Sequence, residues 1–307
     1  MRIQTIYKLD SFYRNDMEVK GYYYGKGEPS ICIMGGLRGN EIQQVYICSQ
    51  LNLKLKQLER DGKIKEGKEI LVIPTGNNSS INVARRFWPS DNTDINRMFP
   101  GYDQGETTQR IAAGIFEKIK DYHYGIQLTS SYMKGYHLPH VRIMHTGYED
   151  VKLADSFNLP YTMIRDPKPY DTTTLNYNWQ IWETNAFSLY TPQTEEINQE
   201  TAKIAVEAIL QFMANQEIID YPVCKVENKV YWEKDLIVIK NEAAGFFTPL
   251  VSIGDHVDNG ELLAEVIDPY SGDVIREITA KGAGKIFFVR NNPLVYANTV
   301  IFRIIPE

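Results

Sequence analysis

The stretch 34–44, with the sequence MGGLRGNEIQQ, has the shape of a metal-binding turn. An apolar strand leads into two glycines and a short loop, and Glu41 then opens a helical pattern. Arg38 stands where such a turn would carry a histidine, and a guanidinium group stays protonated and has no lone pair for a metal. The stretch leaves two possibilities, a protein that hydrolyses its substrate with a metal and one that keeps the shape without the chemistry.

Histidines elsewhere in the chain could form an unusual metal site. His137 and His140 are three residues apart in YHLPHVR, and His123 and His145 flank them. Pro139 favours an extended chain between the first two, so we expect them to line or support a pocket. The sequence contains no phosphate-binding glycine motif and no G-x-S-x-G nucleophile turn.

Strand and helix patterns alternate through the first two thirds of the chain. Short apolar runs predict buried strands at 29–36, 69–76, 124–131, 140–147, 161–166 and 186–192. Apolar residues at three- and four-residue steps predict helices at 40–62, 105–121 and 194–216, the last one capped by Thr194.

Strands rich in Ile, Val and Leu that alternate with helices predict an α/β domain with a largely parallel sheet, covered by helices on both faces. In such sheets function lies beyond the carboxyl ends of the strands. The turn at 35–41, Thr129 and Tyr190 all fall at such ends.

The composition changes after about residue 220. The last part of the chain shows no helical stripe and has short strands punctuated by Gly, Asn and Asp. We therefore predict an α/β domain over residues 1–225 and an all-β domain over residues 226–307.

The overall composition excludes several classes of protein. The net charge is −6 and the Lys and Arg residues are scattered, which gives no support for nucleic-acid binding. No apolar stretch approaches 20 residues, the N-terminus lacks the apolar core of a signal peptide, and the three cysteines are widely spaced. These features predict a reduced, cytoplasmic protein without a membrane partner.

The order of the polar stretches resembles the succinylglutamate desuccinylase/aspartoacylase family, relatives of the zinc carboxypeptidases. G-x-R-G-N-E is followed by NNSSINVARRFWPSDNTDINRMFPG, by GIQLTSSYMKGYHLPHVRI and by FSLYTP. The piece DINRMFPG is close to the family's DLNRxFPG and is the most specific, and the spacing from Asn77 to Arg86 fits its N-P-x-A-F…R stretch. The resemblance covers most of the chain. It implies a carboxypeptidase-like α/β fold followed by a barrel-sandwich domain of the biotinyl/lipoyl type.

The resemblance also implies a zinc ion, held by a His-x-x-Glu pair and a second histidine, with a glutamate as general base. In this chain Arg38 and Thr129 occupy the two histidine positions, and Tyr190 occupies that of the base. Glu41 is the only retained ligand. We therefore expect no cofactor, and we expect Arg38 to lie near Glu41 and to supply the charge of the metal.

Three glutamates are other candidates for the missing base. Glu183 is one of them, and Glu195 and Glu196 are the others. The last two follow Thr194 directly, so they are more typical of first-turn acids in the helix that we expect Thr194 to cap.

The resemblance further implies a carboxylate site. In the family, an arginine and an Asn-Arg pair hold the carboxylate and the polarised carbonyl of an acyl amino acid, and these residues match Arg86, Asn96 and Arg97. An arginine meets a carboxylate with two parallel hydrogen bonds. The alternative for the two arginines is an ion pair with Asp91 or Asp94.

Arg142, in PHVRI, matches a further position of the family. We expect it at the rim of the pocket or in an ion pair. The hairpin tip 270–273 has no lysine of the kind to which biotin or lipoate is attached. We therefore interpret the all-β domain as a lid or spacer over the active edge of the sheet, and as a possible contact in a homo-oligomer.

These patterns predict a protein that binds a small N-acyl amino acid or carboxylate and has a degenerate zinc site. Arg86, Asn96, Arg97, Asn77 and Arg38 are the predicted binding residues. Tyr190 and Arg86 are the residues expected to act if catalysis survives. The alternatives are an active metal-dependent deacylase with a rebuilt zinc site, and a non-catalytic partner subunit of an active relative.

Overall fold

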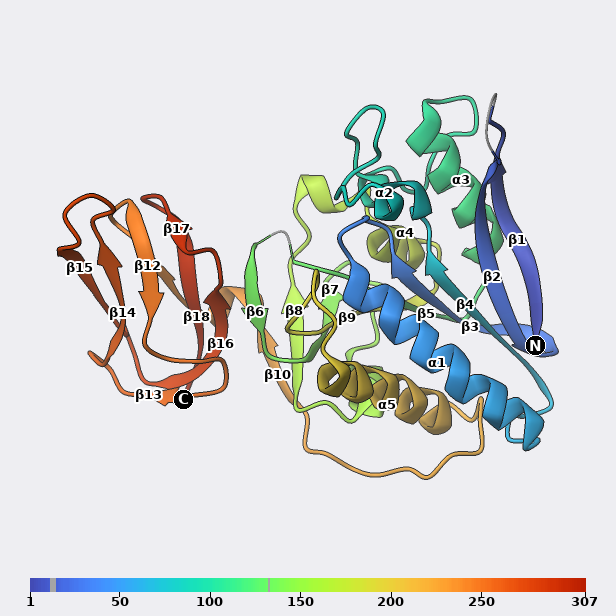
Figure 1. The fold of residues 1–307 in the computed structure, drawn as a ribbon. Coiled ribbons are helices and arrows are strands. Elements are labelled where there is room, and N and C mark those ends of the chain that lie inside the picture. Colours follow the sequence, from blue (N-terminus) through green and yellow to red (C-terminus); the bar gives the residue numbers. More distant parts are fainter. Residues whose placement is uncertain (12–14, 132) are drawn as a thin grey trace.

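The computed structural model describes residues 1–11, 15–131 and 133–307. A nine-stranded sheet runs through its larger part (Figure 1). The strands are β1 (Arg2–Leu9), β2 (Met17–Gly25), β3 (Gly27–Gly36), β4 (Gly67–Thr75), β5 (Tyr124–Leu128), β7 (His140–Met144), β8 (Tyr161–Arg165), β9 (Asn185–Tyr190) and β10 (Lys229–Trp232). They lie in the order β1-β2-β4-β3-β5-β9-β7-β8-β10.

The predicted largely parallel sheet is confirmed. The pairs β3–β4, β3–β5, β5–β9, β7–β8 and β8–β10 are parallel. β7 runs antiparallel to β9, and the N-terminal hairpin of β1 and β2 joins β4 in antiparallel fashion. The sequence patterns did not predict this hairpin. Its strand β1 is mostly exposed, so it lacks the apolar run that marks a buried strand.

Helices cover both faces of the sheet. The main ones are α1 (Ile42–Arg60), α3 (Thr107–Ile119), α4 (Leu175–Ile181) and α5 (Gln199–Asn215). Side chains alternate between the two faces of a strand, so Ile31 and Ile33 of β3 pack in the core beneath α1 and α5, whereas Cys32 and Met34 pack beneath α3 and α4. Burial of each of these isoleucine and methionine side chains contributes roughly 1.5–3 kcal/mol. No helix among the described residues is both long and apolar enough to cross a bilayer.

The shorter helical segments lie in the connections between these elements. They are α2 (Asn78–Asn82), η1 (Ile95–Arg97), η2 (Val151–Phe157), η3 (Pro169–Asp171) and η4 (Glu233–Asp235).

The predicted cap at Thr194 is wrong. α5 begins after Asn198, whose side-chain oxygen accepts a hydrogen bond from the Thr201 amide at 2.9 Å. Asparagine is as good a cap as threonine, and it stands where the apolar period of the helix begins. Residues 194–197 are therefore irregular, and Glu195 and Glu196 are not first-turn acids.

The C-terminal part forms two packed antiparallel sheets. Its strands are β11 (Ile237–Lys240), β12 (Gly245–Pro249), β13 (His256–Val257), β14 (Leu262–Ile267), β15 (Val274–Thr279), β16 (Gly284–Arg290), β17 (Leu294–Val295) and β18 (Val300–Pro306). One sheet has the order β11-β18-β16-β13 and the other β15-β14-β12-β17. A strand from the first part of the chain, β6 (Gly135–His137), pairs with β16. The two parts of the molecule are thus joined by a shared sheet (Figure 1).

Candidate functional site

The candidate site lies at the edge of the sheet where β3, β5 and β9 end. These strands run in parallel, so their carboxyl ends meet at one edge. Arg38 follows β3, Thr129 follows β5, and Tyr190 is the last residue of β9. The sequence patterns predicted this meeting, and the structure confirms it.

Glu41 is buried and accepts hydrogen bonds from five donors. Oε2 accepts from the backbone amides of Leu37 at 2.9 Å and Arg38 at 3.0 Å. Oε1 accepts from the Ser130 amide at 3.1 Å, the Ser130 hydroxyl at 2.7 Å and Arg38 Nη1 at 3.2 Å. A carboxylate offers about four lone-pair positions, so these donors use the full capacity of Glu41.

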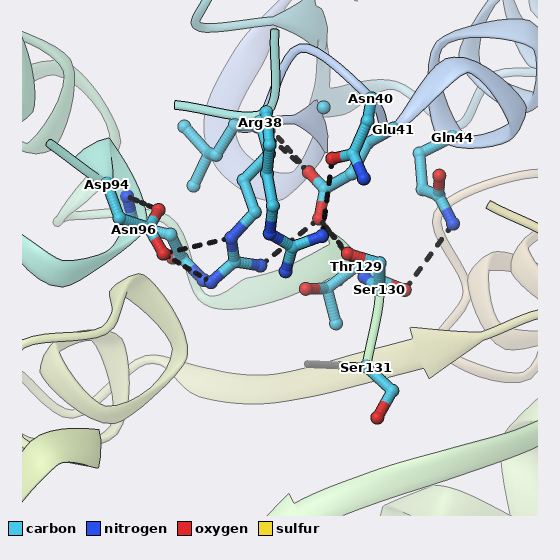
Figure 2. A network of polar contacts seen from close by, with 12 residues as sticks. Arg38, Asn40, Glu41, Gln44, Asp94, Asn96, Thr129, Ser130 and Ser131 are labelled. Atoms are coloured by element: carbon cyan, nitrogen blue, oxygen red, sulfur yellow. Dashed lines mark hydrogen bonds and ion pairs between the residues drawn. The ribbon is translucent and has the colours of Figure 1, made fainter. Parts of the chain in front are cut away.

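Arg38 lies next to Glu41, as expected, and it also holds a second carboxylate. Its Nε and Nη2 atoms lie 3.0 and 2.9 Å from Oδ2 of Asp94. Figure 2 shows the guanidinium group between the two acids, with Ser130 beside Glu41. Burial lowers the pKa of Arg38, but the charges of Glu41 and Asp94 outweigh it and hold the pKa above its ordinary value. Arg38 therefore stays charged.

Neighbouring residues fix the loop that carries this pair. Asn77 is fully buried, donates to the Leu37 carbonyl at 3.3 Å and accepts from the Ser80 amide at 3.2 Å. We predicted that Asn77 binds the ligand, but the structure places it behind the loop and not on a cavity wall. Gln44 donates to the Thr129 carbonyl at 3.4 Å and ties the end of β5 to α1.

The described ranges contain no group of three His, Cys, Asp or Glu side chains that could hold a metal ion. At the position that the resemblance assigns to zinc, the neighbours of Glu41 are a guanidinium group and the hydroxyl and amide of Ser130. His137 and His140 have ring centroids 6.0 Å apart, and both rings are buried among aromatic side chains.

An outer cleft of about 530 Å³ opens beside this site. Arg86 lines it and donates from Nη1 to the Asn40 side-chain oxygen at 3.3 Å. Asn40 in turn donates to Glu195 at 2.8 Å. Arg86 has no carboxylate within ion-pair distance among the described residues, and burial together with the charge of Arg38 lowers its pKa. A ligand carboxylate beside Arg86 would offset both the burial of its guanidinium group and the repulsion from Arg38.

Other residues of the cleft wall come from separate elements. Glu195 and Glu196 line it from the irregular segment before α5, and the C-terminal part contributes Asn291, Asn292 and Pro293. The loop after β16 thus forms part of the cleft wall, and its role as a lid or spacer stays a prediction. Glu183, the third glutamate considered as a base, lies instead at the turn after α4 with a φ of 68° and does not line either cavity.

Asn96 and Arg97 lie on the wall of a second, inner cavity of about 40 Å³. Asn96 is buried, and its Oδ1 accepts from Gln127 Nε2 at 3.0 Å and from the Leu175 amide at 3.3 Å. Arg97 pairs with Asp171 at 3.4 Å and donates to the Tyr170 carbonyl.

The ion pairs that we considered as alternatives are wrong. Asp94 pairs with Arg38, not with Arg86 or Arg97, and Asp91 accepts hydrogen bonds from Thr93. Asp94 and Arg97 lie at the two ends of η1, where Asp94 pairs with Arg38 and Arg97 pairs with Asp171.

A polar row crosses the sheet under the inner cavity. Gln127 of β5 is paired in register with Ser188 of β9, and Ser188 with Arg142 of β7. Paired residues of neighbouring strands point to the same face, so these three side chains lie side by side beneath η1 and α4. Arg142 is thus part of the cavity wall, and it has no carboxylate within ion-pair distance among residues 1–11, 15–131 and 133–307.

Tyr190 lies between the inner cavity and the two buried histidines. Its ring stacks on His140 with centroids 4.8 Å apart, and the guanidinium of Arg142 lies 4.4 Å from the centroid of the ring. Burial raises the pKa of Tyr190, while the charge of Arg142 acts in the opposite direction. The hydroxyl therefore stays protonated near neutral pH, so it cannot replace a glutamate as a ready base.

Several residues of the site were not predicted from the sequence. Ser130 directly follows Thr129 at the end of a predicted strand, so its position in the sequence would have been enough to predict it as a site residue. Arg165, Asp171 and Asn176 carry no local signal, because they enter the cavity wall from connections whose place depends on the strand order.

Comparisons with known proteins identify a matching family. Residues 27–215 match the succinylglutamate desuccinylase/aspartoacylase catalytic domain. The chain is 21% identical over 266 residues to the N-alpha-acetyl-L-2,4-diaminobutyric acid deacetylase of Halomonas elongata, an alignment that covers 80% of this chain and 72% of the relative.

Solved structures share the fold over nearly the whole chain. A product-bound structure of the ectoine utilization protein EutE from Ruegeria pomeroyi has a TM-score of 0.81 at 16% identity and covers 98% of this chain and 93% of its own. A succinylglutamate desuccinylase/aspartoacylase from Rhodobacter sphaeroides has a TM-score of 0.80 at 18% identity, with 99% and 95% covered.

Proposed function

Since the chain belongs to the succinylglutamate desuccinylase/aspartoacylase family, we propose that it is a deacylase-like protein that binds a small N-acyl amino acid or a related carboxylate without standard zinc hydrolysis. The zinc site is degenerate in this proposal, and Arg38 supplies fixed positive charge in place of the metal. The names of similar proteins support this ligand class, because one deacetylates an N-acetyl amino acid and a structure of another was solved with its product.

The hydrogen bonding of Glu41 carries the proposal. Zinc needs three protein ligands and an open position for water. Both oxygens of Glu41 are already used by five donors, and a cation lies 3.2 Å from Oε1. A divalent ion at the same place would have to displace Arg38 and would repel its charge. The residues present therefore do not fit a zinc ion.

The first test measures metal content and activity together. We expect the purified chain to retain far less than one zinc per molecule after equilibration with zinc and gel filtration, as measured by elemental analysis. We also expect no chelator-sensitive release of acetate from N-acetyl amino acids. Stoichiometric zinc accompanied by such turnover would instead support an active deacylase with a rebuilt site.

The second test concerns Arg86. We expect Arg86→Gln to weaken binding of N-acetyl-L-glutamate by about 10–100-fold, because a hydrogen bond to a charged group contributes roughly 1.5–3 kcal/mol. Isothermal titration calorimetry would measure the dissociation constants. Arg85→Gln is a matched control, since Arg85 is exposed and its side chain donates to the Pro89 carbonyl outside the cleft. Equal binding by both variants would contradict the carboxylate role of Arg86.

A further inference from the structure

One edge of the short strand β6 has no neighbouring strand in the part of the chain that the structure describes. β6 pairs with β16 alone, and Figure 1 shows it between the C-terminal part and the α/β sheet. A strand edge without a neighbour presents N–H and C=O groups that can pair with another chain. All three residues of β6, which are Gly135, Tyr136 and His137, line the outer cleft. We therefore place the open edge of β6 at the cleft.

The register of the β6–β16 ladder shows which backbone groups point to this edge. The Leu138 amide donates to the Phe287 carbonyl at 3.0 Å, and the ladder continues in the same register to Tyr136. Bonded and non-bonded positions alternate along an antiparallel pair, so Tyr136 bonds to β16 and its two neighbours do not. The N–H and C=O groups of Gly135 and His137 thus turn away from β16, and they have no backbone partner among the described residues.

The other walls of the cleft suit a ligand longer than one amino acid. They come from Asn40, Arg86 and the irregular segment 191–196, and most of the lining residues are polar or charged. The cleft, of about 530 Å³, lies within the range of roughly 300–1,000 Å³ that is usual for sites of drug-sized ligands. A single N-acyl amino acid with its carboxylate at Arg86 would leave space along β6. That space offers hydrogen bonds, and it has no apolar pocket for a long side chain.

We propose that the open edge of β6 binds an extended peptide, so that the ligand of this protein is a short peptide with a free C-terminal carboxylate at Arg86. The peptide adds a strand to β6, and its main chain bonds to the two N–H and two C=O groups of Gly135 and His137. Positive charge at one end of the cleft and unpaired backbone groups along its wall match the two parts of such a ligand. Main-chain recognition of this kind tolerates different side chains. The inference rests on the proposed function and names its ligand class.

A pair of probes that end in the same residue tests the proposal. They are N-acetyl-L-glutamate and the peptide acetyl-Ala-Ala-Glu with a free carboxyl end. We expect the peptide to bind at least about tenfold more tightly in isothermal titration calorimetry, since one or two net hydrogen bonds already account for about this factor. Arg86→Gln should weaken both probes by a similar factor and leave the ratio of their affinities in place.

Two singly N-methylated peptides test whether the added bonds come from a strand. Successive residues of an extended chain turn their N–H groups to opposite edges. Methylation at the first alanine and methylation at the second should therefore differ. One isomer should lose most of the tenfold gain over N-acetyl-L-glutamate, and the other should keep it. A peptide held only by its side chains would not show this alternation.

Amide hydrogen exchange locates the bonds on β6. We expect saturation with acetyl-Ala-Ala-Glu to slow exchange at the amides of Gly135 and His137 by at least about tenfold, as measured by nuclear magnetic resonance. The Tyr136 amide is the internal control, because it already bonds to β16 and its exchange should change little. N-acetyl-L-glutamate should leave all three amides unchanged.

A pair of variants removes one backbone donor and keeps the side-chain change matched. His137→Pro and His137→Ala both lose the imidazole, but only proline also lacks the N–H group. The His137 amide points away from β16, so proline is compatible with the ladder at this position. We expect His137→Pro to lose the preference for the peptide and His137→Ala to keep it. Thermal melting shows whether both variants fold, and the methylated peptides test the same bonds in the unaltered chain.

Two results would overturn the peptide site. One is equal affinity for the two probes, with both weakened by Arg86→Gln, in which case the proposed function stands and the peptide site does not. The other is a tighter peptide whose two methylated forms bind alike and which leaves the exchange of the Gly135 and His137 amides unchanged. If neither probe binds at all, the proposed function and the peptide site fall together.

Discussion

Arg38→Met is expected to lower the free energy of unfolding by about 3–5 kcal/mol, because removal of one partner leaves buried charges uncompensated. Arg38 is 5% exposed and contacts Glu41 and Asp94, which are themselves largely buried. Methionine has a similar length but brings no charge. Urea unfolding of the variant and of the unaltered chain at pH 7 would measure the difference.

A combined variant identifies the cause of this loss. Arg38→Met with Glu41→Gln and Asp94→Asn removes the carboxylate charges together with the cation, and we expect it to recover much of the stability. Arg85→Met, at an exposed position of comparable type, should change the unfolding free energy by less than about 0.5 kcal/mol. A small effect of Arg38→Met on its own would show that Arg38 does not balance the two acids, and the proposed replacement of a metal charge would lose its basis.

Stability should also fall as the pH drops from about 6.5 towards 4, because two buried histidines are neutral in the folded chain. Burial lowers the pKa of His140 to about 4 and holds that of His137 well below its ordinary value. Both side chains gain protons on unfolding, so their contribution is fully present above pH 6.5 and is lost as the pH falls. At pH 5 we expect a loss of about 2 kcal/mol for His140 alone, relative to pH 7.5.

The charged groups around the imidazole rings of His137 and His140 help to explain why the pKa values of both are lowered. Besides burial, His137 faces His140, Arg303 and Arg142, and their charges oppose its protonation. Glu233 acts in favour of protonation but is weaker. Glu233 itself, with a pKa of about 2, changes its charge only below this pH range.

A substitution at His137 would test the assignment. His137→Phe should flatten the pH dependence of the free energy of unfolding between pH 7.5 and 5, because phenylalanine cannot take up a proton. The phenyl ring can pack against Phe288, and the imidazole that it replaces has two nitrogens without a hydrogen-bond partner in the described chain. The exposed His123 offers a control, and His123→Asn should leave the slope unchanged. Urea unfolding over this pH range measures both. A slope in His137→Phe equal to that of the unaltered chain would contradict the role of His137.

Local patterns in the sequence predicted most of the sheet and the edge at which the site forms. Apolar runs ended by glycine or polar residues placed β3, β4, β5 and β9, because a buried strand must be apolar on both faces. Apolar residues that recur at steps of three and four residues likewise predicted α1 and α3. The predicted start of α5 was wrong because two good capping residues, Thr194 and Asn198, lie four positions apart. Only the hydrogen bond from the Thr201 amide to the Asn198 side chain shows which of them is the cap.

The inner cavity was beyond the reach of these patterns. Gln127, Ser188 and Arg142 each interrupt an apolar strand, and each looks like an isolated exception in the sequence. They become one row only because β5, β9 and β7 are neighbours in the sheet, although β9 follows β7 in the chain. The order of strands is set by long-range packing, so no window of neighbouring residues contains it.

The pairing of β6 with β16 bears on how such proteins diversify. In β6, His137, Tyr136 and Gly135 lie opposite Phe288, Val289 and Arg290 of β16, so a strand ladder ties β6 to the C-terminal part. A recombination event that replaced the last seventy residues alone would leave three backbone positions of β6 without partners unless the new tail carried a strand at the position of β16. Exchange of this tail between relatives therefore requires a strand at the position of β16 in the incoming tail, and side chains that pack across the ladder, such as His137 and Phe288, are expected to change together.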